Sequence, residues 1–166
     1  MTSTQPDVSP AVLREVCGRW ATGVAIVTGN GIDGMPLGMA VNSFTSVSLD
    51  PPLVLFCSAL TSSTWPRIKQ GSRFAVNILA ESQSDLARSF ARSGGDKFAG
   101  VALRSAPDGL PALAGAIARL VCRIEDVHPG GDHEVVVGRV LATELFDGDP
   151  LLFHRGKTAG MALPVS

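Results

Sequence analysis

The sequence predicts a mainly β protein, in which antiparallel strands form a closed barrel with α-helices at its periphery. Three observations support this prediction. Roughly seven short segments are rich in apolar and β-branched residues, and clusters of Gly, Pro, Asn and Asp separate most of them. Helix-like patterns follow some of these strands. A doubly wound parallel sheet would need a helix after most of them, so it is disfavoured.

The chain of 166 residues is long enough for one domain with a buried core. Because 45% of the residues are hydrophobic and 17% are charged, we expect a compact fold, with residues 1–9 as a flexible tail and residues 10–166 as a single domain. The net charge is -1 and no basic stripe is visible, which argues against a nucleic-acid partner.

Cysteine usage and the N-terminal sequence indicate a cytoplasmic protein. Cys17, Cys57 and Cys122 are far apart and form no CxxC pair, so we expect reduced, buried thiols rather than disulfides. The N-terminus lacks the basic and apolar regions of a signal peptide, and no apolar run is long enough to cross a membrane. We therefore expect no membrane partner.

The first elements are a helix and a hairpin. Ser9 and Pro10 can start a helix, and an apolar stripe at helical spacing continues to Trp20 before Gly23 ends the unit. The stripe consists of Leu13, Val16, Cys17 and Trp20. Residues 24–28 read as a strand. GNGIDG at 29–34 matches the dinucleotide fingerprint GxGxxG, but Pro36 and Gly38 follow where a helix should open, so a hairpin loop is the better interpretation.

Further strands and helices alternate irregularly along the rest of the chain. We predict strands at residues 53–57, 74–79, 118–125 and 134–144, helices at 65–70 and after an N-cap at Ser82, a turn at 128–132, and irregular structure at 101–115. A short strand and a loop end the chain. In the strand at 118–125, alternation places Arg119, Arg123 and Glu125 on the solvent side.

The segment MAVNSFTSVSLDPP at residues 39–52 is unusually polar for its apolar surroundings. Its hydroxyl and amide groups can satisfy local backbone groups, and composition alone favours that interpretation. The alternative is a cradle for a phosphate or a polar heterocycle, since small donors add neither bulk nor fixed charge. Ser62–Thr64, at a predicted helix start, allows the same two interpretations, a cap or an anion site.

The turn HPGGDHE contains His128, Asp132, His133 and Glu134, but their spacing matches no strong metal-binding template, and we expect no metal site. His133 opens a strand and can face a pocket, where an imidazole can give or take a proton near neutral pH. Solvent-facing histidines in a hairpin turn are the commoner case.

Several motifs, taken in order, resemble the flavin reductase family, the reductase components of two-component flavin-dependent monooxygenases. They are WATGVAIVT, MAVNSFTSVSLDPPLV, SSTWPRI, GSRFAVNIL, DKFAG, GDHEVVVGRV and PLLFHRGK, which together extend from about Trp20 to Gly156. The resemblance implies a split antiparallel β-barrel of the Greek-key, FMN-binding type. It also implies a cytoplasmic homodimer that binds FMN or FAD, oxidises NADH or NADPH, and supplies reduced flavin to a partner monooxygenase.

The resemblance also implies a set of site residues. Val41, Asn42 and Ser43 match positions along the isoalloxazine ring, and Ser46, Val47 and Ser48, with Ser62, Ser63 and Thr64, match positions near the ribityl phosphate. Lys97 and Phe98 match a loop that closes over the flavin, with Lys97 near its phosphate, and His154 and Arg155 match positions that border the cofactor. His133 matches a position near the nicotinamide and is the candidate catalytic residue.

The sequence departs from the family pattern at Ala40, where a hydroxyl residue is common, and at Asn42, where Ser is common. The chain also contains no tyrosine. Two other functions remain open: a flavin-binding carrier or sensor without reductase activity, and an oxidase of a phosphorylated vitamer on a related barrel. The oxidase would need more basic residues around a substrate phosphate than this chain shows.

Overall fold

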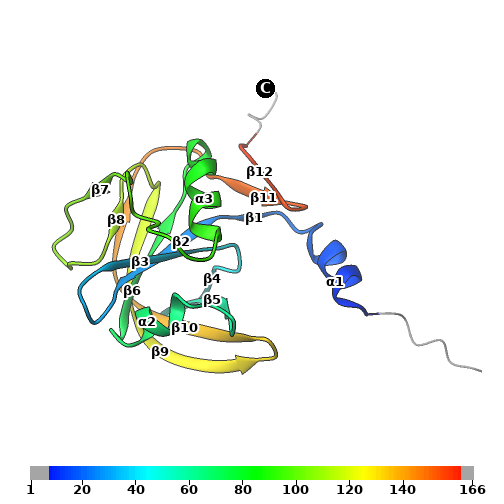
Figure 1. Ribbon diagram of the computed structural model, residues 1–166, viewed down its shortest axis with the longest axis horizontal. Coiled ribbons are helices and arrows are strands. Elements are labelled where there is room, and N and C mark those ends of the chain that lie inside the picture. Colours follow the sequence, from blue (N-terminus) through cyan, green and yellow to red (C-terminus); the bar gives the residue numbers. More distant parts are fainter. Residues whose placement is uncertain (1–7, 162–166) are drawn as a thin grey trace, which may run out of the picture.

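The computed structural model describes residues 8–161 and is built around one curved antiparallel sheet of seven strands (Figure 1). In spatial order the strands are β3 (Pro36–Val41), β2 (Ala25–Asn30), β6 (Arg73–Ile78), β9 (Ala118–Gly130), β10 (His133–Leu145), β5 (Pro52–Ala59) and β4 (Thr45–Leu49). All six neighbouring pairs are antiparallel. The predicted mainly β architecture is confirmed.

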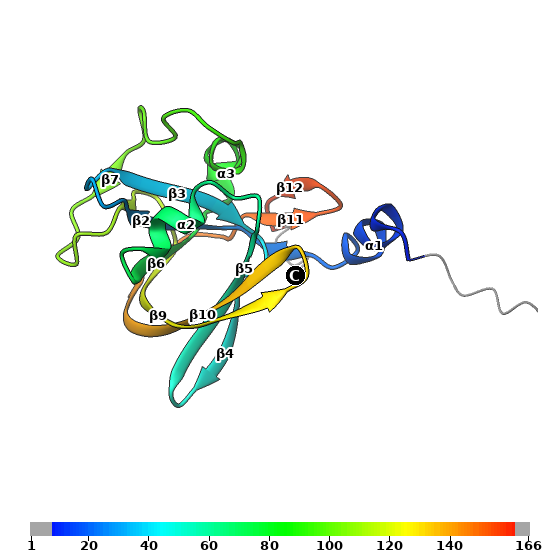
Figure 2. The same ribbon diagram turned by 60° about the horizontal axis from the view of Figure 1, so that its bottom comes forward.

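The sheet curls into a barrel that stays open between its edge strands, β3 and β4 (Figure 2). Over residues 8–161, no hydrogen-bonded ladder joins these two edges. The loop at residues 42–44 connects the two edge strands, and the hydroxyl of Ser43 in this loop bonds to the backbone of Cys57 in β5. The expectation of a closed barrel is therefore wrong, whereas the split barrel implied by the family resemblance is confirmed.

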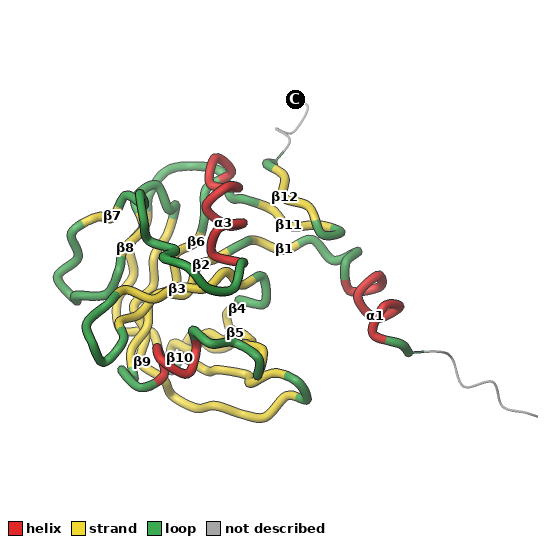
Figure 3. The backbone as a smooth tube through the Cα atoms, in the orientation of Figure 1, coloured by secondary structure: helices red, strands yellow, loops and turns green. Residues whose placement is uncertain are grey.

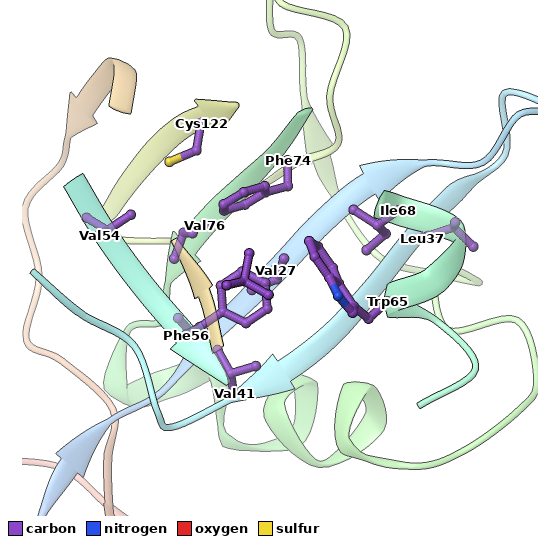
Figure 4. Close-up of a cluster of buried hydrophobic side chains, with 12 residues drawn as sticks. Val27, Leu37, Val41, Val54, Phe56, Trp65, Ile68, Phe74, Val76 and Cys122 are labelled. Atoms are coloured by element: carbon purple, nitrogen blue, oxygen red, sulfur yellow. The ribbon is translucent and has the colours of Figure 1, made fainter. Parts of the chain in front are cut away.

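The barrel interior is packed around three aromatic rings (Figure 4). Phe56, Trp65 and Phe74 meet edge to face, with ring centroids 5.1, 5.4 and 6.1 Å apart. Such pairs contribute about 0.5–1.5 kcal/mol each beyond the burial of their area. Trp65 comes from α2 (Trp65–Lys69), so this cluster fixes α2 against the barrel.

Strand β2 is buried on both faces, which explains its continuous apolar sequence. Val27 points into the barrel core, and Ile26 packs on the outside with Phe90 of α3 (Ser84–Ala91). Nearby, the polar side chains of Thr28 and Asn77 are fully buried, but both have hydrogen-bond partners. The Thr28 hydroxyl donates to the Pro111 carbonyl at 2.7 Å, and Asn77 Nδ2 donates to Thr28 Oγ1 at 3.1 Å. These bonds hold the 110–113 segment on the barrel wall.

Smaller elements complete the fold (Figure 3). They are β1 (Thr22–Gly23), β11 (Leu152–His154) and β12 (Lys157–Ala159), which form a three-stranded sheet, and β7 (Leu103–Arg104) and β8 (Ala112–Leu113), which pair within the segment predicted to be irregular. The GNGIDG segment is a hairpin loop between β2 and β3, as predicted. Of the helices that the structure describes, none has the length and apolar character needed to cross a bilayer.

The N-terminal helix is shorter and more exposed than predicted. Ser9 caps α1 (Pro10–Cys17) as expected, but the helix ends at Cys17, so Trp20 does not belong to it. Within the described chain, α1 buries none of its residues, and Cys17 is exposed rather than buried. Figure 1 shows α1 projecting from the barrel. Residues 1–7 of the predicted tail lie outside the described residues.

Ser82 does not cap the later helix. It lies inside a 3₁₀ turn, η1 (Glu81–Gln83), and α3 begins at Ser84. The Gln83 side chain accepts a hydrogen bond from the Ala80 backbone N–H at 3.0 Å and so closes the 3₁₀ turn, whereas no side chain caps the start of α3 itself.

Arg119 was expected to face solvent, but its side chain is 1% exposed. The 101–115 segment folds over the outer face of β9 and supplies Asp108, which pairs with the guanidinium at 2.7 and 2.9 Å. Glu144 of β10 lies 3.0 Å away on the other side. Burial of this charge is possible because two carboxylates and the Leu110 carbonyl accept its hydrogen bonds.

Candidate functional site

A series of hollows follows β3 along the open side of the barrel. Four cavities line up along residues 35–43, and each shares lining residues with the next. Gly38 is the point where β3 lies closest to α3, because a side chain there would place Cβ 2.5 Å from the Phe90 ring. Together the four cavities form a groove with β3 as its floor. We call them, from the Met35 end, the outer, hydroxyl, middle and arm hollows.

The hydroxyl hollow, with a volume of about 190 Å³, lies where β5 passes into α2. It is lined by Thr61, Ser62, Ser63 and Thr64 from this connection, by Met39 and Ala40 of β3, and by Lys97 and Arg92. The Ser62 hydroxyl accepts hydrogen bonds from the backbone N–H groups of Thr64 and Trp65, at 3.3 and 3.2 Å. Ser62 therefore stabilises the turn that leads into α2, and Ser63 and Thr64, the N-cap residue, contribute the remaining hydroxyls of this motif.

Lys97 provides positive charge at this point of the groove. Its ammonium group donates to the carbonyl oxygens of Phe90, at 3.2 Å, and Gly38, at 3.4 Å. Burial lowers the pKa of Lys97. An ammonium group has three donors, so one remains for another acceptor. Among the described residues that line the hydroxyl hollow none is a carboxylate, and Arg92 adds a second cation. This donor set suits a phosphate.

The outer hollow, of about 490 Å³, shares Ser63, Thr64 and Lys97 with the hydroxyl hollow. It adds Met35 and Pro36 from the start of β3, Arg67 from α2, and Phe98. The Phe98 ring packs edge-on against Phe90, with centroids 5.0 Å apart. Lys97 therefore lies on the wall between the two adjoining hollows, and Phe98, which the family resemblance pairs with it, lines the outer hollow.

Toward the other end of β3 the groove narrows at the middle hollow and then widens at the arm hollow, which Arg14, Glu15 and Arg155 line among others. The middle hollow, of about 170 Å³, is lined by Val41, Asn42, Ala40 and Phe153. It shares Asn42 with the arm hollow, of about 710 Å³, which lies between α1 and the β11–β12 turn. Ser43, Trp20 and Arg155 line the arm hollow. The structure therefore brings Val41, Asn42, Ser43 and Arg155 together at this end.

Arg155 has an unusual backbone conformation. Its φ of 50° is positive, which is uncommon for a residue other than glycine and is often found at functional sites. Its backbone N–H donates to the Gly18 carbonyl at 3.0 Å, so the β11–β12 turn is tied to the end of α1. His154, the preceding residue, lines a neighbouring surface hollow with Arg155 and Lys157.

Four of the predicted site residues lie away from the groove within one copy of the chain. Ser46, Val47 and Ser48 lie on the edge strand β4, where Ser46 and Val47 are exposed. His133 begins β10, and its Nδ1 lies 2.7 Å from Asp132 Oδ1. This hydrogen bond lowers the pKa of the Asp132 carboxyl. None of the four lines the hollows described above.

Sequence reasoning did not single out several residues that line the groove. They are Met35, Thr61, Arg67 and Arg92, with Trp20 and Phe153 at the wide end. Thr61 adjoins the SST motif and Arg67 lies two residues after Trp65, so the local sequence gave a weak signal for both. Over residues 8–161, no cluster of three or more His, Cys, Asp or Glu residues is arranged to hold a metal ion.

Comparisons with known proteins show which family this chain resembles. A family model described as flavin reductase like domain matches residues 17–162. The reductase subunit HsaB of a flavin-dependent monooxygenase from Rhodococcus jostii is 44% identical over 155 residues, which cover 93% of this chain and 79% of that protein. The FMN reductase (NADH) SmoA from Agrobacterium fabrum is 42% identical over 143 residues, covering 86% of this chain and 81% of that protein.

Solved structures show the same similarity. The NADH:FAD oxidoreductase of Streptomyces globisporus, in complex with NAD and FAD fragments, superposes with a TM-score of 0.90. It is 36% identical in sequence, and the match covers 99% of this chain and all of that one.

Proposed function

Because the chain belongs to the flavin reductase family, we propose that it transfers a hydride from NADH or NADPH to FMN or FAD and supplies the reduced flavin to a flavin-dependent monooxygenase. The observation that carries this proposal is the groove along β3. It joins an anion-binding section at Lys97 to a wide section at Asn42 and Ser43, where Trp20 and Phe153 add apolar surface. A flavin nucleotide has the same division between a flat ring and a phosphate.

The residues present fit a flavin phosphate. Ser63 and Thr64 present hydroxyls to the hydroxyl hollow, and Lys97 has a remaining N–H donor there. Charge-assisted hydrogen bonds from an ammonium group to an anion are roughly twice as strong as neutral ones. Lys97 therefore provides most of the affinity for the phosphate, while the neutral hydroxyls fix the orientation of the phosphate and add little affinity. Moderate affinity suits a protein that must release reduced flavin.

The residues at the other end fit the flavin ring. Asn42 lies where the middle and arm hollows meet, and its amide offers both donors and acceptors to a heterocycle. When both cofactors are bound, they supply the redox chemistry, in which a hydride passes from the nicotinamide to the flavin. The task of the protein is to hold the two rings face to face and to place donors where negative charge develops. The Asn42 amide and the edge of β3 serve this task, and Trp20 and Phe153 offer apolar surface beside them.

A homodimer completes this proposal. The apolar stripe of α1 has no partner within the described chain, with Leu13 51% exposed, Val16 64% exposed and nearby Trp20 78% exposed. The edge strand β4 is also largely exposed to solvent in one copy of the described chain, and its Leu49 is 93% exposed. A second copy that covers these surfaces would bring its own β4 and His133 toward a groove that one copy leaves open. His133 then takes its proposed place near the nicotinamide, and Ser46–Ser48 their place near the ribityl phosphate.

The cellular setting that we propose is the cytoplasm, where flavin-dependent monooxygenases can collect reduced flavin. Cys17, Cys57 and Cys122 are all free thiols, as a reducing compartment maintains them.

Steady-state kinetics tests the function. Purified protein is mixed with each of the four pairs of NADH or NADPH with FMN or FAD, and the loss of reduced nicotinamide is followed by absorbance. The proposal predicts flavin-dependent oxidation with at least one pair. A protein that binds flavin but oxidises neither nicotinamide would instead be a flavin carrier or sensor, and the proposal would be wrong.

A further inference from the structure

The hydroxyl groups of the groove lie directly before α2, so the position of this helix decides where they point. Ser63 and Thr64 line the hydroxyl hollow, and Trp65, the first residue of α2, follows them at once. The helix has only five residues. A helix of this length is not stable by itself, so contacts with the barrel must hold it in place.

One carboxylate, that of Glu134 in β10, contacts both ends of α2. Its Oε2 accepts a hydrogen bond from the indole N–H of Trp65 at 2.9 Å, and its Oε1 accepts one from the ammonium group of Lys69 at 3.0 Å. Trp65 is the first residue of α2 and Lys69 is the last. The hydrogen bond from Lys69, and after it that from Trp65, lowers the pKa of Glu134, which is therefore ionised near neutral pH.

The Trp65 contact fixes the start of the helix. The Trp65 side chain is 2% exposed, and its ring packs edge to face against Phe56 and Phe74 (Figure 4). An indole nitrogen can only donate, and a buried donor without an acceptor is costly. The ring therefore keeps the orientation that reaches Glu134, and Thr64, the residue before it, is fixed with it.

Glu134 is itself held by the sheet. It lies opposite Ser58 of β5 and Pro129 of β9. Beside it, the backbone N–H of Leu60 donates to the Asp132 carbonyl at 2.9 Å, so the chain that leaves β5 toward α2 is also tied to the β9–β10 turn. The Glu134 carboxylate thus connects a rigid strand to a short helix that needs support.

We propose that Glu134 is a positioning residue of the flavin site, whose carboxylate holds α2 so that the hydroxyls of Ser63 and Thr64 meet the flavin phosphate. This inference rests on the proposed function, because it takes the hydroxyl hollow as the phosphate site. Glu134 lines none of the four hollows of the groove. It acts through Trp65 and Lys69 rather than on the flavin.

Titration with FMN and with riboflavin, followed by the quenching of flavin fluorescence, tests the inference. The two ligands differ only in the phosphate, so the ratio of their dissociation constants measures phosphate binding. In Glu134→Ala we expect the preference for FMN to fall about tenfold, because hydrogen bonds from the hydroxyls to an anion are lost, while riboflavin affinity changes less than about twofold.

Two further variants separate positioning from general support of the fold. Glu134→Gln keeps an oxygen for the indole N–H, so its preference for FMN should stay within about threefold of the wild-type value. Trp65→Phe keeps an aromatic ring but removes the N–H donor, so its preference should fall in the same direction as in Glu134→Ala.

Glu125→Ala is the matched control. Glu125 is 29% exposed, against 27% for Glu134, and it also accepts hydrogen bonds from a cation, Arg139, at 2.6 and 2.9 Å. Arg139 belongs to β10 rather than to α2, so this variant should keep the wild-type ratio. An unchanged ratio in both Glu134→Ala and Trp65→Phe, or parallel losses of FMN and riboflavin affinity, would overturn the inference.

Steady-state oxidation of NADH and NADPH separates this inference from the proposed function. If flavin is reduced but Glu134→Ala keeps the wild-type preference for FMN, the positioning role is wrong and the flavin reductase function stands. If the wild-type protein prefers FMN to riboflavin but reduces no flavin with either nicotinamide, the proposed function fails. The binding ratios of the variants then still decide the positioning role.

Discussion

The hydroxyl group of Ser43 accepts a hydrogen bond from the backbone N–H of Cys57 at 2.9 Å and donates one to the Cys57 carbonyl oxygen at 3.3 Å. Ser43 lies in the loop that connects β3 to β4, and it stands opposite Cys57 where the antiparallel β4–β5 register continues, so the two bonds fix this loop to β5. This hydroxyl, which the family resemblance places along the flavin ring, is thus already engaged with the protein backbone. It fixes the wide end of the groove.

Ser43→Ala should therefore destabilise the fold and loosen the wide end of the groove. Two lost hydrogen bonds and newly unpaired backbone groups correspond to about 1–3 kcal/mol of unfolding free energy. Urea denaturation measures the loss, and Ser46→Ala on exposed β4 should stay within about 0.5 kcal/mol of the wild-type protein. Equal stability of Ser43→Ala and Ser46→Ala would contradict the bridging role.

Lys97→Gln should weaken the binding of FMN while leaving riboflavin, which has no phosphate, nearly unchanged. The substitution keeps a polar side chain but removes the ammonium group that lies against the Gly38 and Phe90 carbonyls. A charge-assisted hydrogen bond is worth about 1.5–3 kcal/mol, which corresponds to roughly a tenfold to hundredfold loss of FMN affinity. Fluorescence titration with both ligands measures the difference. Parallel losses for FMN and riboflavin would show that Lys97 does not contact the phosphate.

Asp108 should make stability depend on pH in the acid range. The hydrogen bonds from Arg119 hold the pKa of Asp108 at about 2, below its ordinary value of 3.8. Because the folded-state pKa is the lower one, the contribution is fully present above about pH 4 and is lost as the pH falls toward 2. Asp108→Asn should be less stable at pH 7 and should lose less stability between pH 4 and 2. Urea midpoints across this range measure both effects, and an unchanged slope would refute the assignment.

The apolar stripe of α1 should hold two copies together. Replacing Leu13 and Val16 by Asp places charges on this stripe, which has no partner in the described part of the chain. Light scattering after gel filtration should give the mass of two chains for the wild-type protein and of one chain for the double variant. Glu15→Lys, on the exposed polar side of the helix, is the control and should remain dimeric. A dimeric double variant would place the interface elsewhere.

Local patterns in the sequence were sufficient for the five inner barrel strands, β2, β6, β9, β10 and β5, but not for the polar edge strand β4. Strand β2 reads as strand because its apolar residues are buried on both faces, and GNGIDG reads as a hairpin because Pro36 blocks a helix. The helical spacing of Trp20 was misleading, because α1 ends at Cys17. The backbone N–H groups of Arg19 and Trp20 then bond to the carbonyls three residues earlier, so the chain leaves the helix in tight turns. Spacing alone does not show where a helix stops.

Long-range contacts account for most of what the sequence did not reveal. The residues around Arg119 in the sequence do not indicate that its side chain is buried, because its partner Asp108 lies on the separate 101–115 segment. The groove depends on how β3, α2 and α3 approach one another, so Met35 and Arg67 gave no clear signal. Lys97 and Ser62–Thr64 were grouped through the family resemblance, and the structure places them around one hollow.

Anaerobic stopped-flow mixing with NADH, repeated with NADPH, tests the central claim most directly. The protein is loaded with FAD, or with FMN in a parallel run, and the absorbance of the oxidised flavin is followed after mixing with reduced nicotinamide. The account predicts rapid bleaching that saturates with nicotinamide concentration and slows in Lys97→Gln at limiting flavin. Bound flavin that stays oxidised with both nicotinamides would contradict it and would identify a carrier or sensor.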